Sequence, residues 1–311
     1  MINCPFKKVL LPVDRSDNSR RAIKFAGALL SGVEGSGITI LYVMAGGYLS
    51  EHMKNIDFRA ELIKDTEVFK KIKAKHIEEN ITPFLNEYES ILLKTSGLKG
   101  EIAKRIEEGE PGNKIIEIAT KESFQTVILA RRGMSELKSL ILGSVSNKVI
   151  HGLLNQNIYL VGQKISEQSP VSRILVPVDG SEYSTKAVEH AVCLAKIVKG
   201  IENITVLRVI NISLYLERVR QGIDPETEAD EILNKAKKRF TEEDIPEQLI
   251  VTKSKVGFPA DEILKEIEEG GYNLIIMGRK GRTAMKDLVL GGVSSSVINK
   301  CIETTVAIVN L

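Results

Sequence analysis

The sequence predicts an α/β fold built as two tandem, Rossmann-like domains, each a doubly wound parallel sheet of five strands. Short apolar segments alternate with amphipathic helical segments five times in each half of the 311-residue chain. The second half repeats the order of the first, including a Pro-Val-Asp segment and a glycine-containing segment. Each half is long enough to bury its own hydrophobic core. We therefore expect domains at residues 1–164 and 172–311, joined by a polar linker at 165–171.

Each predicted domain opens with an apolar strand that ends in Pro-Val-Asp, at Asp14 and at Asp179. Ser16 and Ser181 follow two residues later, and we expect both to cap the next helix because a serine hydroxyl accepts the first free backbone N–H groups. Proline opens two further predicted helices, at 111–122 and 259–269, where its missing N–H costs nothing. The remaining strands are expected at 38–44, 100–106, 126–130 and 157–161 in the first half, and at 204–210, 249–256, 274–277 and 305–309 in the second.

The halves differ most between the second and third strands. The first half has about 18 more residues between Val43 and Pro111 than the second has between Val209 and Pro259. The additional residues fall in a charged, helical stretch at 51–94. We expect a longer packing helix there, and a lid over the site is the alternative.

Composition narrows the function classes. The net charge of +2, the absence of tryptophan and an aromatic content of 5% argue against nucleic acid as a partner. No apolar run approaches the ~20 residues that a membrane span needs. The N-terminus lacks a signal peptide, so a cytoplasmic location is expected. Cys4, Cys193 and Cys301 lie far apart without CxxC spacing, which predicts separate thiols and no zinc site.

The chemistry is expected where parallel strands end, because ligands of doubly wound sheets bind at the carboxyl ends of the strands. In the second half, Gly278 and Gly281 follow a strand, and Gly291 precedes a helix. Glycines let backbone N–H groups approach an anion, and a helix N-terminus favours phosphate. Asp179 could accept hydrogen bonds from a ribose or adenine, and Val209 could pack against a base. Basic side chains at Arg279, Lys280 and Arg282 could add positive charge at the rim.

The combination of both segments in both halves resembles the universal stress protein family, in its tandem two-domain form, over essentially the whole chain. ATP-binding members of that family carry G-x2-G-x9-G-[S/T] after the fourth strand and an aspartate after the first. The resemblance implies an adenine-nucleotide alpha-hydrolase-like fold and bound ATP. A magnesium ion can accompany the ATP. The second half departs from the motif at Gly292, where the family has Ser or Thr, and the first half departs at Ala130, where the family has glycine.

The methyl group of Ala130 would crowd a phosphate or ribose, and a positive φ would cost Ala130 about 1 kcal/mol or more. We therefore rank the second half as the stronger nucleotide site. Its predicted binding residues are Pro177, Val178, Asp179, Val209, Met277, Gly278, Lys280, Gly281, Gly291, Gly292, Val293 and Ser294. The first half is either a weaker site or a structural relic, and the residues predicted for the weaker site are Val13, Asp14, Val43, Ala130, Gly133, Gly143, Ser144, Val145 and Ser146.

Three functions stay open at this point. The first is an ATP-binding stress-response sensor or regulator, the second a nucleotide-free interaction module, and the third a slow ATPase or nucleotidyl transferase. The sequence lacks the P-loop motif, the first-strand glycine motif of hydride-transfer enzymes and any evident general base, so we expect no catalytic residues and no protein-bound metal. The resemblance also implies a dimer contact through the last strand. We expect the last strands of the two halves to pair within the chain, a homo-oligomer to form, and an unidentified protein to be a partner.

Overall fold

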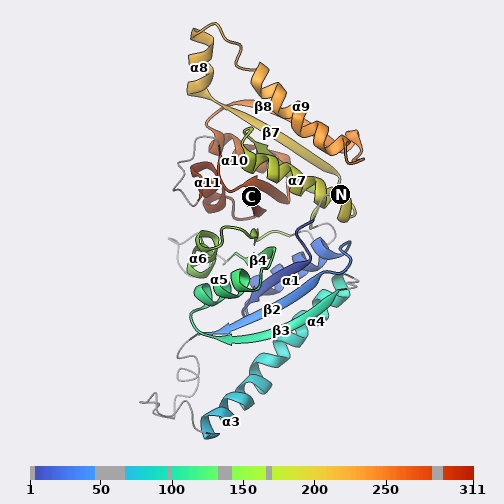
Figure 1. Cartoon of the computed structure of the whole chain (residues 1–311), viewed down its shortest axis with the longest axis vertical. Helices are drawn as coiled ribbons and strands as arrows, with labels where there is room; N and C mark the ends of the chain where they lie inside the picture. Colours follow the sequence, from blue (N-terminus) through green and yellow to red (C-terminus); the bar gives the residue numbers. More distant parts are fainter. Residues whose placement is uncertain (1–3, 46–66, 97–99, 132–141, 166–169, 282–289) are drawn as a thin grey trace.

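The computed structural model describes residues 4–45, 67–96, 100–131, 142–165, 170–281 and 290–311 of the chain. These residues form a three-layer α/β structure around one mostly parallel, ten-stranded sheet that runs through both halves (Figure 1). The strand order is β3-β2-β1-β4-β5-β10-β9-β6-β7-β8, so each half has the same internal order. The predicted doubly wound α/β class is thus confirmed.

The element bounds agree closely with the repeat found in the sequence. The strands of the first half are β1 (Lys8–Val13), β2 (Gly37–Met44), β3 (Glu101–Glu108), β4 (Thr126–Ala130) and β5 (Asn157–Val161). Those of the second half are β6 (Arg173–Val178), β7 (Asn203–Asn211), β8 (Ile250–Gly257), β9 (Leu274–Gly278) and β10 (Thr305–Val309). The precise limits of the two domains and of the linker stay a prediction.

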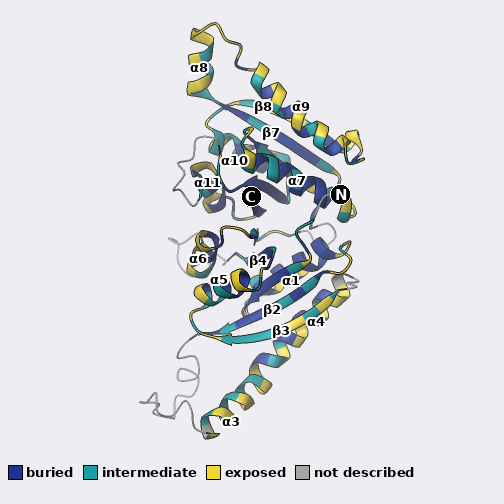
Figure 2. Cartoon of the chain, in the orientation of Figure 1, coloured by how far each residue is buried: buried dark blue, intermediate teal, exposed yellow. Residues whose placement is uncertain are grey.

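Helices cover both faces of the sheet. One layer contains α1 (Asp17–Leu30), α4 (Thr82–Ser96), α7 (Glu182–Ile197) and α9 (Thr227–Thr241), whose apolar residues pack in one core. The other layer contains α5 (Pro111–Lys121), α6 (Ser144–Gly152), α10 (Pro259–Gly270) and α11 (Gly292–Lys300), packed in a second core. The burial of the sheet between these layers is visible in Figure 2, whereas α8 (Ile212–Arg220) has no buried residue. Both cores extend through both halves, so the chain has continuous cores on each face.

Both predicted serine caps are present. The Ser16 hydroxyl accepts a hydrogen bond from the Ser19 N–H at 3.2 Å, and the Ser181 hydroxyl accepts one from the Ser184 N–H at 3.1 Å. A serine at this position satisfies one of the N–H groups that the helix itself leaves without a partner. The caps therefore start α1 and α7 directly after the first strand of each half.

The two halves join through an antiparallel pair of β5 and β10, as expected from their short apolar sequences. Tyr159 lies opposite Ala307, and the neighbouring pairs are Leu160 with Val306 and Ile158 with Ile308. Tyr159 and Ala307 occupy equivalent places in the two halves, so the pseudo-twofold axis passes between them. Pairing of these edges satisfies backbone groups that an open edge would expose.

Two buried arginines repeat this symmetry. The Arg131 guanidinium in the first half donates to the Ile298 carbonyl at 2.7 Å, and Arg279 in the second half donates to the Ile150 carbonyl at 2.9 Å and to Leu153. All three acceptors lie near the end of the last helix of the opposite half, where a cation is favoured by the helix dipole. Burial lowers the pKa of Arg131 to about 10, so it stays charged at neutral pH. The arginines thus join the halves through hydrogen bonds beside the strand pair.

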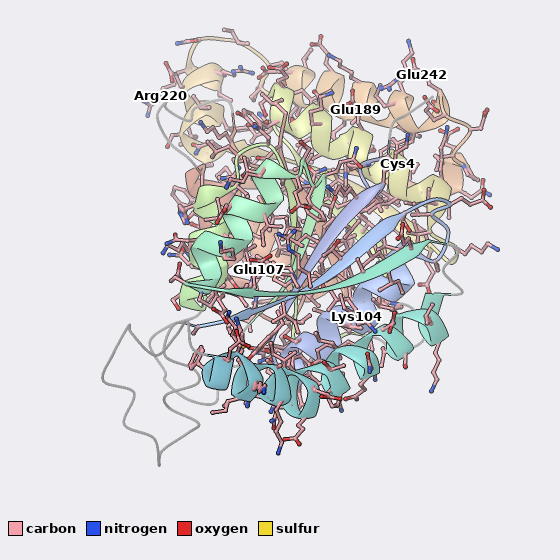
Figure 3. The ribbon with its side chains drawn as sticks, turned by 60° about the horizontal axis from the view of Figure 1, so that its bottom comes forward. Cys4, Lys104, Glu107, Glu189, Arg220 and Glu242 are labelled. Carbon is pink, nitrogen blue, oxygen red and sulfur yellow. A yellow bond between two sulfur atoms is a disulfide. The ribbon has the colours of Figure 1, made fainter. Side chains whose placement is uncertain are left out.

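A disulfide between Cys4 and Cys193 corrects the expectation of separate thiols (Figure 3). The two residues are separated by 189 positions, with Cα atoms 5.6 Å apart. Cys4 precedes β1, whereas Cys193 lies within α7 of the other half. Spacing rules fail here because the pairing of the halves, and no local motif, brings the two sulfur atoms together. The free cysteine of the described residues is Cys301, which is buried.

Aromatic side chains fill the interface next to this disulfide. Phe6 packs against Tyr159 and His190 with ring centroids 6.2 and 5.5 Å away, and Tyr159 also contacts Phe25. The Tyr159 hydroxyl forms a hydrogen bond with His190 Nε2. Burial lowers the pKa of His190 to about 4, because a charged imidazole would lose its hydration there. His190 therefore holds the interface together as a neutral ring.

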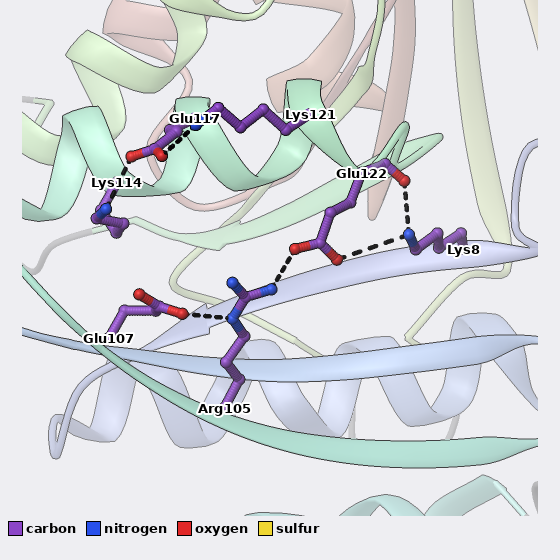
Figure 4. A network of polar contacts seen from close by, with 7 residues as sticks. All are labelled: Lys8, Arg105, Glu107, Lys114, Glu117, Lys121 and Glu122. Carbon is purple, nitrogen blue, oxygen red and sulfur yellow. Dashed lines mark hydrogen bonds and ion pairs between the residues drawn. The ribbon is translucent and has the colours of Figure 1, made fainter.

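Ion pairs join the edge strand β3 to the end of α5 and, through Glu122, to β1 (Figure 4). Arg105 on β3 contacts Glu107 at 2.7 Å and also pairs with Glu122, which in turn contacts Lys8 of β1. These side chains are partly exposed, so each pair contributes about 0–1 kcal/mol. Their charges also discourage association with another strand at this open edge.

Removal of the disulfide should lower stability. Cys193→Ala removes the disulfide that links the two halves. Alanine is a suitable replacement because the equivalent position of α1 is Ala28. We expect the free energy of unfolding to fall by on the order of 2–4 kcal/mol, because the unfolded chain gains freedom. Thermal unfolding with and without a thiol reductant measures it: the reductant should lower the wild-type midpoint and leave that of Cys193→Ala unchanged. Cys301→Ala is the matched control, and an equal response to reductant in wild type and Cys193→Ala would contradict the role of the disulfide.

Acid should weaken the interface through His190. Its folded pKa of about 4 lies below the unfolded value of about 6.5, so the unfolded state binds the proton more readily. The contribution is fully present above about pH 6.5 and is lost as the pH falls toward 4, by on the order of 3 kcal/mol. His190→Gln keeps a polar partner for Tyr159 and removes the titration. Urea unfolding at pH 7 and pH 4.5 should show that the free energy of unfolding falls less for this variant than for wild type. An equal fall in the two proteins would contradict the role of His190.

Candidate functional site

The strand order places one candidate site in each half. Loops after β1 and β4 turn to opposite faces of the sheet, as do those after β6 and β9, and such a divergence opens a crevice at the carboxyl ends of the strands. In the first half, this crevice is a cavity of about 540 Å³. That volume lies in the usual range for small-molecule sites. The residues that line it are Pro12, Val13, Asp14, Ser16, Asn18, Ser19, Leu41, Tyr42, Val43, Pro111, Ile115, Leu129, Ala130, Gly143, Ser144, Val145 and Ser146.

Eight of the nine residues predicted for the first half line this cavity. They are Val13, Asp14, Val43, Ala130, Gly143, Ser144, Val145 and Ser146. The ninth, Gly133, lies outside the described residues. The crevice also includes residues that sequence analysis missed, such as Ser19 of α1 and Ile115 of α5. Ser19 could have been found, because Asp14-x-Ser16-x2-Ser19 recurs as Asp179-x-Ser181-x2-Ser184.

Asp14 is held in place by its own turn. Its carboxylate Oδ1 accepts hydrogen bonds from the Ser16 N–H at 2.9 Å and from the Ser19 hydroxyl at 2.7 Å, and the Ser16 hydroxyl contacts the same oxygen. The other carboxylate oxygen, Oδ2, has no hydrogen-bond partner within the described part of the chain. Asp14 is exposed, so Oδ2 is open to a donor in the cavity. The turn thus presents one fixed acceptor at the end of β1.

A helix N-terminus also lines the cavity. Gly143 is the N-cap of α6 and has no side chain with which to bind the first N–H groups. Ser144 is exposed at the first helical position, whereas the Ser146 hydroxyl donates to the Ala130 carbonyl at 3.3 Å. Free N–H groups and the helix dipole favour an anion. Leu41, Leu129 and Ile115 give the cavity an apolar wall.

The second half brings several of its predicted residues together more tightly. An added Cβ at Gly281 would lie 2.7 Å from Asp179 Oδ2, so the glycine loop rests directly on this carboxylate. Gly291, the N-cap of α11, donates its N–H to the Arg279 carbonyl at 3.0 Å. The Ser294 hydroxyl is buried and donates to the Gly278 carbonyl at 2.9 Å, so its proton serves the protein backbone.

The other predicted residues of the second half surround this loop. Pro177 and Val178 end β6, Met277 precedes the last residue of β9, and Val209 lies near the end of β7. Gly292 and Val293 are exposed at the start of α11, and Lys280 is half-buried. The nucleotide role predicted for this set, including Pro177, Val178, Asp179 and Lys280, remains a prediction.

The prediction that Arg279 adds positive charge at the rim of the site is wrong. Arg279 is 2% exposed, and its guanidinium points to Asn310 and to the opposite half, as described above. The cause is the extended backbone of the strand end: Gly278 and Lys280 flank Arg279, and Arg279 N–H pairs with the Val309 carbonyl of β10. Arg282, the other predicted rim residue beside Lys280, lies outside the described residues.

Gly278 and Ala130 differ because their neighbours differ. Neither has a positive φ. An added Cβ at Gly278 would lie 2.6 Å from the carbonyl carbon of Tyr183, so Gly278 makes room for the start of α7. The equivalent place in the first half accommodates the methyl of Ala130. The cost that a positive φ would give Ala130 is therefore absent.

Metal ligands are sparse at both crevices. Within the described ranges, no group of three or more His, Cys, Asp or Glu side chains is arranged to hold a metal ion. The same ranges contain no helix with the length and apolar character that a bilayer crossing requires.

The fold defines a tandem, doubly wound α/β protein with a cavity at the carboxyl ends of the strands in its first half. The sequence model of the universal stress protein family matches residues 5–153 and, a second time, residues 170–309. The chain belongs to the universal stress protein family and contains two of its domains in tandem.

Individual relatives agree with this assignment. A universal stress protein of Methanocaldococcus jannaschii is 28% identical over 158 residues, which are 49% of this chain and 90% of that protein. A universal stress protein of Mycolicibacterium smegmatis is 22% identical over 289 residues, or 93% of this chain and 92% of that protein. A crystal structure of a universal stress protein from Archaeoglobus fulgidus has the same fold, with a TM-score of 0.67, 23% identity and 98% of each chain covered.

The packing role of Gly278 can be tested by substitution. Gly278→Ala should reduce the free energy of unfolding by about 1–3 kcal/mol, because the methyl would overlap the α7 backbone at Tyr183. Gly292→Ala is the matched control, since an added Cβ there meets nothing within 4 Å. Urea unfolding compares the two variants. Equal stability of Gly278→Ala and Gly292→Ala would show that Gly278 is free of this packing constraint.

Proposed function

We propose that this chain binds an adenine nucleotide, ATP, in the first-half crevice and acts as a stress-response regulator. The observation that carries the proposal is the cavity itself, which joins an acceptor at Asp14, an apolar wall and an uncapped helix N-terminus. A nucleotide has the same three parts, namely a ribose with hydroxyl donors, an apolar base face and anionic phosphates. The chemistry of the lining therefore fits this ligand class.

Each part of the lining has a role in binding. The apolar wall of Leu41, Leu129 and Ile115 would hold the base, and Asp14 Oδ2 would accept from a ribose hydroxyl. The phosphates would meet the N–H groups of Ser144 and Val145 at the start of α6. ATP would supply the signal of cellular energy state, and any magnesium would arrive with its phosphates.

The glycine motif predicts the stronger site in the second half, and this proposal places it in the first half. The complete Gly278, Gly281 and Gly291 set supports the second half. The cavity, the relaxed backbone at Ala130 and the Oδ2 atom of Asp14, which has no partner among the described residues, support the first half. We give these features more weight because they concern space for a ligand.

The wider functional setting belongs to the same proposal. We propose a binding protein in the cytoplasm in preference to a fast enzyme, because the described lining of the cavity has no histidine and Asp14 is its sole carboxylate. Slow ATP hydrolysis and a nucleotide-free interaction module are the alternatives. Homodimer formation and an unidentified protein partner remain predictions.

A matched pair of charge substitutions tests the site. Ser144→Asp places a carboxylate at the first position of α6, and Gly292→Asp places one at the equivalent position of α11. Both should fold, because an acidic residue in the first helical turn is favourable. We expect Ser144→Asp to weaken ATP binding at least ~10-fold, since the carboxylate repels phosphate, while Gly292→Asp retains wild-type affinity.

Calorimetric titration with ATP, ADP and AMP measures these affinities and the stoichiometry. Wild-type protein that binds none of the three at millimolar concentration would overturn the proposed function. Loss of binding in Gly292→Asp, with Ser144→Asp unchanged, would instead move the site to the second half, as the glycine motif predicts.

A further inference from the structure

The additional helical segment of the first half reaches the candidate nucleotide site. It consists of α3 (Glu67–His76), a π-helical turn at Ile77–Ile81 and α4, in direct succession. The α4 part packs on α1, whereas α3 extends beyond the sheet (Figure 1). This segment therefore connects the loop after β1 with α3, which projects from the protein and is called the arm below. The described part of the segment fits the predicted longer packing helix; residues 51–66 of the prediction lie outside the described residues.

Tyr88 of α4 fixes the backbone of the cavity-lining turn. Its hydroxyl donates to the Asp14 carbonyl at 2.8 Å and lies 3.4 Å from the Ser16 carbonyl. Tyr88 is 2% exposed, and burial together with the nearby Asp14 charge raises its pKa to about 12, so the hydroxyl keeps its proton. The backbone of Asp14, a residue that lines the cavity, is thus held by α4 as well as by its own turn.

Arg15 makes a second connection between this turn and the segment. Its guanidinium donates to the Asn80 carbonyl in the π-helical turn and stacks over the Phe84 ring, 5.2 Å from the centroid. Phe84 in turn contacts Tyr42 and Tyr88 edge to face, with centroids 5.2 and 5.7 Å away. Single π turns inside α-helices often occur at functional sites. Here the π-helical turn lies between the arm and α4, where Arg15 of the loop after β1 contacts it.

The second half lacks both connections. The position of Arg15 is taken by Gly180, with φ 81°, after Asp179. The buried positions Leu85, Tyr88 and Leu92 of α4 recur with the same spacing in α9 as Leu233, Ala236 and Phe240, so a methyl group stands where Tyr88 has its hydroxyl. The contrast shows that neither connection is required by the fold.

We propose that Tyr88 and Arg15 couple the first-half site to the projecting helix α3, with Tyr88 as a positioning residue for Asp14. This inference rests on the proposed nucleotide site. Because coupling between two sites is reciprocal, a ligand that engages Asp14 stabilises the arm, and a contact that holds the arm strengthens ligand binding. The arm is the element through which occupancy of the crevice is communicated outward.

The first experiment is a double-mutant cycle read by ATP titration of the full chain. Tyr88→Phe removes only the hydroxyl and keeps the ring contacts with Phe84. We expect a 5- to 10-fold weaker affinity for ATP in the wild-type background, and no further weakening when Asp14→Ala is already present. Tyr215→Phe, on the remote helix α8, is the matched control and should bind as wild type does.

The second readout reports on the arm itself. Trypsin cleavage at the exposed Lys70 and Lys71 of α3 should slow at least threefold when ATP saturates wild-type protein. The protection should be lost in Tyr88→Phe and in Arg15→Ala at saturating ATP. A role confined to folding would change cleavage equally with and without ATP.

The outcomes separate the two proposals. If wild-type protein binds no ATP, the proposed function fails, and with it the ligand on which the coupling rests. If wild-type protein binds ATP at the first-half crevice while Tyr88→Phe binds equally well and keeps the protection of α3, the coupling is overturned and the nucleotide site stands. Additive effects of Tyr88→Phe and Asp14→Ala would likewise overturn the coupling.

Discussion

The antiparallel contact between β5 and β10 is the interaction on which the rest of the structure depends. Each half alone would end in a short apolar edge strand with unsatisfied backbone groups, and the contact removes both edges at once. It also brings α6 and α11 within reach of Arg279 and Arg131, which no single domain could accommodate as buried cations. The pairing therefore determines the continuous sheet, the shared cores and the location of the polar groups between the halves.

Symmetry of the backbone does not extend to the chemistry of the two crevices. Both halves have an aspartate after the first strand and an uncapped helix after the glycine loop. In one half the loop rests on Asp179 through Gly281, and in the other a cavity separates Asp14 from α6. Duplication leaves one copy free to keep the common architecture while the other acquires contacts of its own, such as those of Tyr88.

Much of this arrangement could be predicted from the sequence, because repeats and strand-end motifs are local signals. β4, β5 and β10 have the expected bounds, and the serine caps follow from the Asp-x-Ser spacing. The partners of Arg279, Cys193 and Tyr88 could not be predicted, because each lies across a helix layer or in the other half. Gly278 shows a related limit: its motif suggested phosphate, whereas its close neighbour is the backbone of Tyr183. Local patterns identify where a loop lies, and long-range packing decides what it touches.

The connection between Cys4 and Cys193 has a mechanical consequence. Because it attaches the N-terminal segment to α7, the residues between them form a closed covalent loop. A pulling force applied at the two ends of the chain would pass from Cys4 directly into α7 and on to Leu311. The first half, with its cavity and its helical arm, would lie outside the load path and keep its shape under tension.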